Sequence, residues 1–303
     1  MISVSDISKS FGKKGEIKAL SHINMEVREG ELFGLLGPDG AGKTTLFRIV
    51  TTLMLPDSGL VTVGGYNAVK DFKILRSKLG YMPGRFSLYQ DLTVAENLTF
   101  YASIFNTTIE ANYHLIRDIY VQLEPFKARR AGALSGGMKQ KLALCCALIH
   151  KPEVLVLDEP TTGVDAVSRK EFWQMLRRLK DEGITILVST PYMDEASMCD
   201  RLALIQQGLI LDQGTPDGLV SGFPDRLLSL ATPDIYRAKA IVEKIDGVDD
   251  AYIFGESLHI KTAALNEKAI AAALAAHGVA AGEVRSILPS IEDVFLAKMH
   301  DVS

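Results

Sequence analysis

The sequence contains few cysteines and no apolar run that approaches the length of a membrane-spanning helix. Its three cysteines, Cys145, Cys146 and Cys199, form neither a CxxC pair nor a metal-ligand spacing, so we expect buried thiols in a reducing compartment. The longest apolar runs, such as Val154–Leu157 and Ile184–Val188, have the length of a strand, whereas a membrane helix needs about 20 apolar residues. The first residues also lack the basic and then apolar pattern of a signal peptide. These absences predict a cytoplasmic chain that serves a membrane only from its inner face, through a partner.

Positive charge is not in excess either. The formal net charge is -4, which argues against the strongly basic footprint that is typical of nucleic-acid-binding proteins. The chain has an ordinary globular composition, with 47% hydrophobic and 23% charged residues, which is enough to bury a sizeable core. Its 303 residues suit one large domain followed by a smaller one.

Apolar patterns predict a mixed α/β fold in the first 220 residues. Strands are expected at 2–7, 19–27, 31–36, 59–63, 154–157, 184–189, 201–205 and 209–211. The continuous apolar run at 154–157 is typical of a strand that is buried on both faces of a parallel sheet. Helices are expected from about Lys43, over most of residues 93–150 and over 168–180, and Thr93 with Glu96 forms a capping-box sequence.

The residues after the segment 221–225 differ in composition and predict a second, smaller domain. Strands are expected at 226–231, 249–254, 257–262 and 282–288, and helices at 234–245, 265–277 and 290–299. The first six of these elements follow the order βαββαβ, which is the order of a ferredoxin-like α+β unit. We therefore expect a C-terminal domain over residues 225–303.

A glycine-rich segment between a predicted strand and a predicted helix fits the phosphate-binding pattern G-x-x-x-x-G-K-[ST]. The motif consists of Gly37, Pro38, Asp39, Gly40, Ala41, Gly42, Lys43 and Thr44, and Thr45 follows it. Its glycines let backbone N–H groups turn toward phosphate oxygens at a helix N-terminus. Lys43 can then reach the β- and γ-phosphates, and Thr44 can offer its hydroxyl to Mg²⁺. Taken alone, the motif also fits a plain glycine-rich turn between a strand and a helix.

Two carboxylates follow the apolar strand at 154–157. Asp158 ends this strand and Glu159 comes next. Ligands bind at the carboxyl ends of the strands in open α/β sheets, so Asp158 is a candidate Mg²⁺ ligand. Glu159 is a candidate base that polarises a water for attack on the γ-phosphate. The pair is weak evidence alone and strong evidence together with the phosphate loop.

The segment Leu134–Met138 (LSGGM) decides among the families of phosphate-loop proteins. It resembles LSGGQ, the signature sequence of ABC ATPases, and precedes Asp158 at the distance usual in that family. The resemblance implies that Ser135, Gly136 and Gly137 bind the γ-phosphate of an ATP molecule held by the opposite subunit of a dimer. The backbone N–H groups of a helix N-terminus suit such a contact. A simple helix N-cap by Ser135 is the alternative.

Further matches extend this resemblance over residues 1–220. Residues 160–165 (PTTGVD) are similar to the family's D-loop, with Val164 where Leu is usual. Phe11 stands in the place of the aromatic residue that stacks on adenine in the family. The alternative for Phe11 is a core position.

The segment at 79–98 is similar to the stretch that receives a coupling helix of the transporter's membrane subunit. Phe86, Leu88 and Tyr89 are apolar side chains in what is expected to be a surface loop. They suit a docking site, and packing against the neighbouring helices is the equal alternative.

Two positions depart from the family pattern. The family usually has a Gln that helps to bind Mg²⁺ where this chain has Gly84, and a His that contacts the γ-phosphate where this chain has Pro191. Losing one such donor costs about 10²–10³ in rate in comparable sites. The chain is then either a slow but active ATPase or a degenerate subunit that binds ATP while another subunit completes the competent site. Glu159 favours the first interpretation, because a chain freed from catalysis would not be expected to keep it.

The resemblance implies an ABC ATPase fold, with a phosphate-loop α/β core, an antiparallel β part and a helical part near residues 86–150. It also implies that the chain binds ATP and Mg²⁺ and closes head to tail with a second ATP-binding subunit, as a homodimer in preference to a heterodimer. Closure would drive a separate membrane permease of the ABC-2 type, with no nucleic-acid partner.

The C-terminal segment 289–295 (PSIEDVF) is similar to a motif of drug-exporter and ABC-2-type ATPases, which favours an exporter. One alternative is an importer ATPase whose residues 225–303 are regulatory. Another is a soluble ABC ATPase that acts on ribosomes or DNA. Such proteins usually carry two nucleotide-binding domains or a long coiled-coil insertion, and this sequence has a single set of motifs and no heptad run.

Overall fold

The computed structural model describes residues 1–13, 15–223, 226–280 and 282–300. The chain forms two compact units, Met1–Pro216 and Asp217–Ser303. The predicted domain boundary was the segment 221–225, of which residues 224 and 225 lie outside the described residues, whereas the two units meet between Pro216 and Asp217. None of the helices formed by the described residues is long and apolar enough to cross a membrane.

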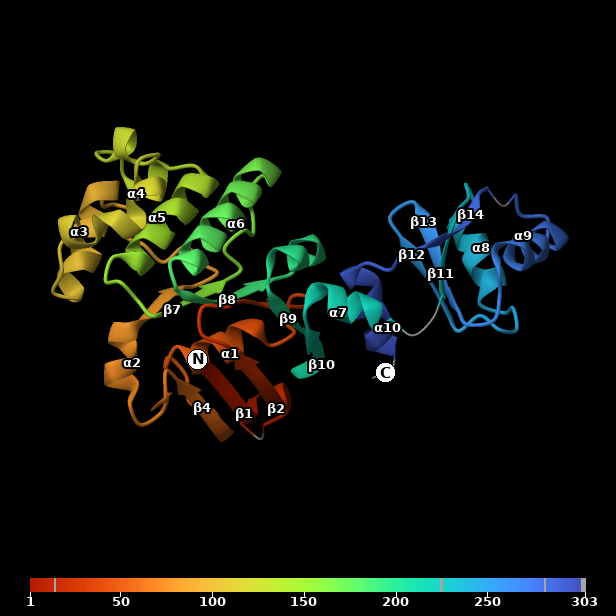
Figure 1. Cartoon of the computed structure of the whole chain (residues 1–303), viewed down its shortest axis with the longest axis horizontal. Helices are drawn as coiled ribbons and strands as arrows, with labels where there is room; N and C mark the ends of the chain where they lie inside the picture. Colours follow the sequence, from red (N-terminus) through yellow and green to blue (C-terminus); the bar gives the residue numbers. More distant parts are fainter. Residues whose placement is uncertain (14, 224–225, 281, 301–303) are drawn as a thin grey trace. The chain divides into compact units, whose positions relative to one another are not determined.

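A six-stranded sheet organises the first unit (Figure 1). Its strands in spatial order are β10 (Leu209–Gly214), β9 (Arg201–Gln206), β3 (Leu32–Leu36), β8 (Thr185–Thr190), β7 (Val154–Asp158) and β6 (Leu79–Met82). All pairs are parallel except β10 with β9. Within β7, Val154 and Val156 contribute to one hydrophobic core, and Leu155 and Leu157 contribute to the other. The strand is therefore buried on both faces, as its continuous apolar sequence predicts.

An antiparallel sheet and a helix cover one face of the six-stranded sheet. The antiparallel sheet has the order β2 (Ile17–Val27), β1 (Ile2–Phe11), β4 (Ser58–Val63) and β5 (Tyr66–Asn67). Helix α1 (Lys43–Val50) lies between the two sheets (Figure 1), and its apolar residues pack with those of both sheets in one core. The phosphate-loop segment enters this helix directly, so both sheets fix the start of α1 in place.

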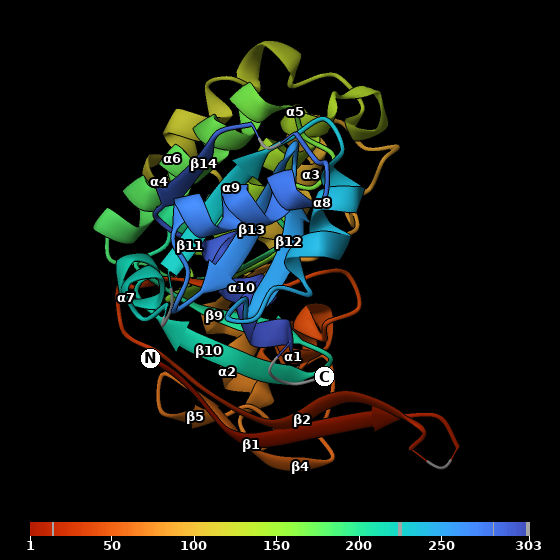
Figure 2. The ribbon, with the colours of Figure 1, turned by 90° about the vertical axis from the view of Figure 1, so that its right-hand side faces the viewer.

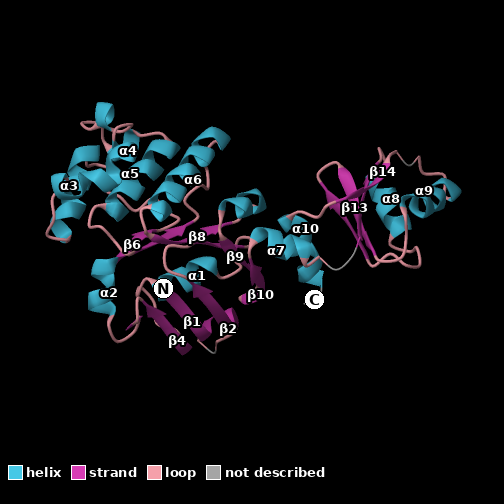
Figure 3. Cartoon of the chain, in the orientation of Figure 1, coloured by secondary structure: helices cyan, strands magenta, loops and turns pink. Residues whose placement is uncertain are grey.

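Helices cover the opposite face (Figure 3). They are α3 (Val94–Ile104), α4 (Tyr113–Tyr120), α5 (Gly136–Leu148) and α6 (Ala166–Asp181). The Thr93 side chain accepts from the Glu96 N–H, and the Glu96 side chain accepts from the Thr93 N–H, so the predicted capping box is present at the start of α3. Cys145, Cys146 and Cys199 are buried and free. Burial raises the pKa of all three thiols.

The second unit is a ferredoxin-like α+β fold followed by a helix. Its elements are α7 (Pro216–Ser221, which begins at the end of the first unit), β11 (Arg226–Ala231), α8 (Ile235–Val242), β12 (Asp250–Phe254), β13 (Ser257–Thr262), α9 (Glu267–Ala276), β14 (Val284–Ile287) and α10 (Ile291–His300). The strand order β12-β13-β11-β14 is antiparallel throughout. Helices α8 and α9 pack on one face of this sheet, in front of the strands in Figure 2.

A buried polar cluster joins α10 to the other face of this second sheet. Asp293 Oδ1 lies 2.6 Å from His259 Nδ1 and accepts a hydrogen bond of 3.0 Å from the Tyr252 hydroxyl. Its Oδ2 accepts from the Ser290 N–H and hydroxyl at 2.7 and 2.6 Å. The His259 ring stacks on Phe254. Because every Asp293 oxygen has donors, this charge can stay buried.

We expect Asp293→Asn to destabilise the second unit by about 3–5 kcal/mol at neutral pH, because the variant leaves buried donors without their carboxylate. Burial by itself raises the pKa of Asp293, but hydrogen bonds from His259 and Ser290 outweigh burial and hold this pKa below its ordinary value of 3.8. The carboxylate's contribution to stability is therefore complete above about pH 4 and is lost as the pH falls through the lowered native pKa. Urea unfolding at about pH 7 and about pH 3 measures this. If the free energies of unfolding of wild type and variant differed by the same amount at both pH values, the lowered pKa of Asp293 would be contradicted.

Candidate functional site

The predicted phosphate loop connects β3 to α1. Gly42 is the N-cap of α1 and has a φ of 110°, a conformation that L side chains rarely adopt. A Cβ at this position would lie 2.5 Å from the Ala19 carbonyl oxygen of β2. Only glycine therefore lets the loop pass this close to the antiparallel sheet.

Lys43 is the buried cation of this loop. Its side chain is 3% exposed, and its Nζ donates to the carbonyl oxygens of Gly37 and Pro38 at 2.7 and 2.9 Å. The same Nζ lies 3.0 Å from Glu159 Oε1. The structure thus brings together the lysine and the candidate base, which the sequence analysis placed in one site without predicting their ion pair.

Asp158 is the last residue of β7 and Glu159 follows it, at the carboxyl edge of the parallel strands. Asp158 is 2% exposed, and its Oδ1 accepts a hydrogen bond of 2.8 Å from the Ser189 hydroxyl at the end of β8. The Glu159 N–H donates to Ser189 Oγ at 3.0 Å, and Glu159 has a left-handed φ of 50°. Ser189 therefore fixes both acidic residues. Ser189 was not among the predicted site residues, although a polar residue at the end of a buried strand was a usable signal.

A cavity of about 140 Å³ opens beside these residues. Its lining residues are Ala19, Gly40, Ala41, Gly42, Lys43, Thr44, Thr45 and Glu159. Asp158 is not among them. No cluster of three histidine, cysteine or acidic residues that could hold a metal occurs in the described part of the chain. Thr44 and Asp158 do offer hard oxygen donors, which fit Mg²⁺ when phosphate oxygens and water complete its coordination.

Gly84 and Pro191, the two departures, come after β6 and β8, the strands on either side of β7. A Cβ at Gly84 would lie 3.1 Å from the Asp158 carbonyl oxygen and 3.7 Å from Asp158 Oδ2. Pro191 directly follows β8. Tyr81 of β6 is half-buried nearby, and burial, together with the Asp158 charge, raises the pKa of its phenol to about 12. It is therefore neutral at physiological pH.

The signature-like segment does not line this cavity. Ser135 is the N-cap of α5, and its hydroxyl accepts from the Met138 N–H. Ser135 and Gly136 are exposed, and a Cβ at Gly137 would meet the Ser168 side chain at 3.2 Å. The segment thus presents a helix N-terminus to solvent, close to the start of α6. Within one chain it is separate from the phosphate loop.

Phe11 is the last residue of β1 and is 39% exposed. It pairs with Ile17 of β2, two positions from the cavity-lining Ala19. Lys9 Nζ lies 5.8 Å from the centre of its ring. Phe11 is therefore a surface residue near the phosphate loop, which excludes the alternative of a core position.

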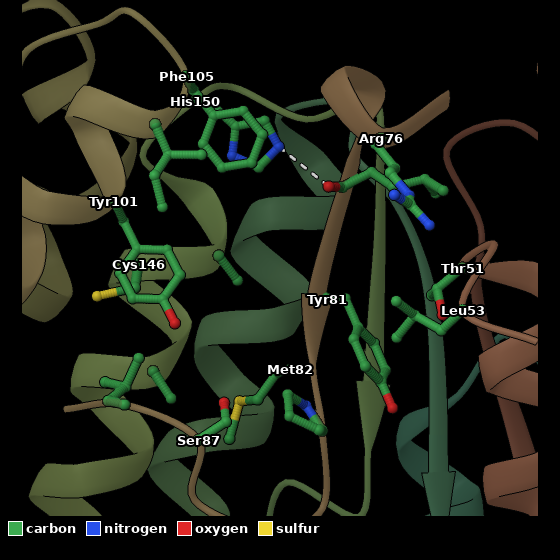
Figure 4. Close-up of a pocket in the computed structure, with 16 residues that line it drawn as sticks. Thr51, Leu53, Arg76, Tyr81, Met82, Ser87, Tyr101, Phe105, Cys146 and His150 are labelled. Atoms are coloured by element: carbon green, nitrogen blue, oxygen red, sulfur yellow. Dashed lines mark hydrogen bonds between the residues drawn. The ribbon is translucent and has the colours of Figure 1, made fainter. Parts of the chain in front are cut away.

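A second cavity, of about 380 Å³, lies between the sheet and the helices (Figure 4). Its walls come from β6 and the loop after it, from α3 and α5 with the residues that follow them, and from Thr51, Leu53 and Arg76. The His150 ring stacks on Phe105, and its Nε2 forms a hydrogen bond with the Leu79 carbonyl oxygen. These two contacts close one end of the cavity (Figure 4). Leu88 lines the cavity and is buried, while Tyr89 is 52% exposed.

Phe86, the third apolar residue of this loop, is partly buried and packs against the core under the helices. Lys139 Nζ lies 5.6 Å from its ring centre. All three apolar side chains at 86–89 therefore have packing partners within the chain, because the half-exposed Tyr89 ring contacts Phe100 edge to face, with 4.9 Å between the ring centres.

Comparison with known proteins gives consistent matches. A family model described as "ABC transporter" matches residues 20–162. The "Probable multidrug ABC transporter ATP-binding protein YbhF" of Escherichia coli (strain K12) is 42% identical over 264 residues, which are 86% of this chain and 46% of that protein. The chain thus spans about half the length of that relative. The "Nod factor export ATP-binding protein I" of Rhizobium sp. (strain N33) is 35% identical over 310 residues, which are 97% of this chain and 95% of that protein.

Among solved structures, the dimeric ATP-binding cassette MJ0796, in a post-hydrolysis state with ADP and Pi bound, has a similar fold. The TM-score is 0.64 at 25% identity, and the match covers 71% of this chain and 98% of that one.

Proposed function

The chain belongs to the ABC transporter family as an ATP-binding subunit, and from this premise we propose that it hydrolyses ATP to drive export through a separate membrane protein. The observation that carries the proposal is the cavity in which the phosphate loop, Lys43 and Glu159 face one another. The name of the Rhizobium relative, which refers to Nod factor export, and that of the E. coli relative, which refers to a multidrug transporter, support export.

The residues around the cavity suit phosphoryl transfer from ATP to water. The N–H groups of the phosphate loop and the Lys43 ammonium would hold the β- and γ-phosphates. Glu159 would accept a proton from the water that attacks the γ-phosphorus. Thr44 and Asp158 would hold Mg²⁺, which offsets phosphate charge when it is bound. Because Lys43 and Glu159 form an ion pair, the phosphates must compete with Glu159 for Lys43, and this competition would release Glu159 toward the water.

A second subunit would complete the site. Ser135 and Gly136 lie exposed at the start of α5 and do not line the cavity of their own chain, so they are free to bind the γ-phosphate held by another chain. We propose a head-to-tail homodimer with ATP in its interface. The dimeric form of the similar cassette with ADP and Pi bound supports this arrangement.

The 380 Å³ cavity is the proposed docking site for the membrane partner. It is largely apolar, and the exposed Leu53 and the cation Arg76 stand among its lining residues. A helix of an ABC-2-type permease at the inner face of the cell membrane would place apolar side chains in it.

We also propose residues 1–220, with a helical part near 86–150, as the nucleotide-binding domain and residues 225–303 as an accessory domain. Every residue of the phosphate cavity lies in the first unit.

The direct test is phosphate release from Mg-ATP by the purified chain. We expect slow hydrolysis. The rate of phosphate release per chain should rise with protein concentration, because the competent site forms between two chains. If the chain binds ATP but releases no phosphate at any concentration, hydrolysis by a homodimer is wrong. The degenerate alternative, in which a different subunit supplies the competent site, would then be favoured.

We expect the double substitution Gly84→Gln with Pro191→His to raise the hydrolysis rate while nucleotide affinity changes little, because the two restored donors act mainly in the transition state. Each donor contributes up to about 10²-fold in ideal geometry. The gain will be smaller here, because a Cβ at position 84 is tight against Asp158 and the loop at 191 is shaped around a proline.

Steady-state phosphate release measures this gain. The matched control is Gly84→Ala with Pro191→Ala, which adds a Cβ at position 84 and removes the proline ring at position 191 but supplies no donors. An unchanged or lower rate in the Gln/His variant, with native circular dichroism, would mean that another group positions the water.

A further inference from the structure

Three segments around the proposed catalytic edge meet at one buried carboxylate, Glu195. It lies on a short 3₁₀ helix, Met193–Met198, that follows the Pro191 loop, and it is 4% exposed. Neither the phosphate-loop motif nor the signature-like segment includes it. A carboxylate this buried is costly unless it is paired or hydrogen-bonded, so its contacts indicate what it holds.

One oxygen of Glu195 joins the segment after β7 to the end of β8. Glu195 Oε2 accepts hydrogen bonds from the Thr161 hydroxyl at 3.1 Å and from the Thr190 hydroxyl at 2.5 Å. Both threonines are buried. The Thr190 hydroxyl in turn accepts from the Tyr192 N–H at 3.0 Å, so the carboxylate also fixes the backbone on the far side of Pro191.

The other oxygen faces α6. Glu195 Oε1 has no hydrogen-bond partner in the described part of the chain, and Arg169 Nη1 lies 3.8 Å away. The Arg169 guanidinium also stacks over the Tyr192 ring at 4.6 Å. Arg169 stands in the first turns of α6, and its N–H donates to the Asp165 carbonyl oxygen. Glu195 therefore contacts Thr161, within the segment that resembles a D-loop, and lies close to Arg169, shortly after that segment.

The tethered residues adjoin the acidic pair. Thr190 follows Ser189, which bonds Asp158 and Glu159, and its carbonyl oxygen accepts from the Gly37 N–H at 3.4 Å. Thr161 is two residues from Glu159. A shift in the Glu195 carboxylate would therefore move the ends of β7 and β8 against each other, at the place where the water must be positioned.

We propose that Glu195 is a positioning residue for ATP hydrolysis: it clamps the segment after β7 to the end of β8 and so sets the orientation of Glu159. The role rests on the proposed ATPase function. Glu195 does not line the phosphate cavity, so it acts through Thr161 and Thr190. Pro191 offers no side-chain donor, which leaves the geometry of this edge dependent on the clamp.

The test measures kcat, KM and ATP affinity for Glu195→Ala, Glu195→Gln and Thr161→Val. A misplacement of about 1 Å costs on the order of 10²-fold in rate, so Glu195→Ala should lower kcat by about 10- to 100-fold and change ATP affinity by less than about twofold. Glu195→Gln keeps an acceptor for both threonines and loses only the charge toward Arg169, so it should retain most of the activity. Thr161→Val removes one arm of the clamp, so its kcat should lie between those of Glu195→Ala and Glu195→Gln.

Asp194→Asn is the matched control, since Asp194 is exposed on the same short helix and lies 3.8 Å from Arg169 but, within the described part of the chain, has no hydrogen bond to either threonine. A double-mutant cycle separates a clamp from independent effects: Thr161→Val should cost little further in the Glu195→Ala background, because the arm it removes is already gone. Additive losses would overturn the proposal.

The remaining outcomes are also decisive. A kcat of Glu195→Ala within about twofold of the Asp194→Asn value overturns the positioning role and leaves the ATPase function standing. If Glu195→Ala does not fold, Glu195→Gln and Thr161→Val carry the test, and equal losses of kcat and ATP affinity in Thr161→Val would indicate a merely structural role. A wild-type chain without hydrolysis removes the proposed function, and the positioning role falls with it.

Discussion

Lys43→Ala should reduce ATP binding to a level that titration does not detect. The ammonium is buried and lies in the cavity with the phosphate-loop N–H groups. It is therefore the close positive charge available to the β- and γ-phosphates. Truncating one partner of a buried charged pair costs about 2–5 kcal/mol, which is about 30- to 5,000-fold in affinity. The variant also leaves the Glu159 carboxylate in the cavity without its cation, so repulsion between this carboxylate and the phosphates adds to the loss.

Titration with a fluorescent ATP analogue, in the presence of Mg²⁺, measures the effect. Lys170→Ala is the matched control, because it removes the same charge from an exposed position on α6 and should bind like the wild type. Equal affinities of Lys43→Ala and wild type, with both proteins folded, would mean that the nucleotide does not bind at this loop.

The sequence predicted those parts of the fold whose signals are local. The strands β7 and β8 were visible because a continuous apolar run needs no other explanation than burial on both faces. The phosphate loop was visible because only glycine tolerates the conformation at Gly42. The ferredoxin-like order of the second unit followed from alternating patterns, and the strand order confirms it.

Short elements shaped by tertiary contacts were missed. Strand β6, helix α2 (Phe72–Lys78) and strand β5 were not among the predicted elements. Within β6, Gly80 weakens the strand pattern, and a Cβ there would lie 2.5 Å from the Ala147 carbonyl oxygen. The glycine is thus required by a neighbour that is remote in the sequence, and no local pattern reveals it.

The candidate site shows the same difference between features with local sequence signals and features that depend on tertiary contacts. The positions of Lys43, Asp158 and Glu159 at the edge of the sheet were predicted from motifs. The ion pair between Lys43 and Glu159 and the contacts of Glu195 depend on which loops the sheet order brings together, because β8 lies between β3 and β7. That order was not available from the sequence. The roles of the site residues, including Ser135 and Phe11, stay predictions.

Glu159→Gln should nearly stop hydrolysis and leave an ATP-bound dimer. The amide has the size and shape of the carboxylate, and it can still accept from the Thr162 hydroxyl, which lies 3.4 Å from Glu159 Oε2. It cannot take a proton from water, and general-base catalysis contributes about 10²–10⁴-fold. The substitution also removes the negative charge that competes with the phosphates for Lys43, so ATP affinity should be equal or higher. Since hydrolysis reopens the proposed dimer, the closed form should accumulate.

Size-exclusion chromatography with Mg-ATP, together with phosphate release, measures both consequences. Glu182→Gln is the control, because Glu182 is an exposed carboxylate at the end of α6, and this variant should hydrolyse ATP and elute like the wild type. A Glu159→Gln variant that still hydrolyses ATP at the wild-type rate would show that another group is the base. A variant that binds ATP tightly, has lost hydrolysis and still elutes as a monomer would keep Glu159 as the base but reject closure between two copies of this chain. The signature-like segment would then have to act on a different ATP-binding subunit.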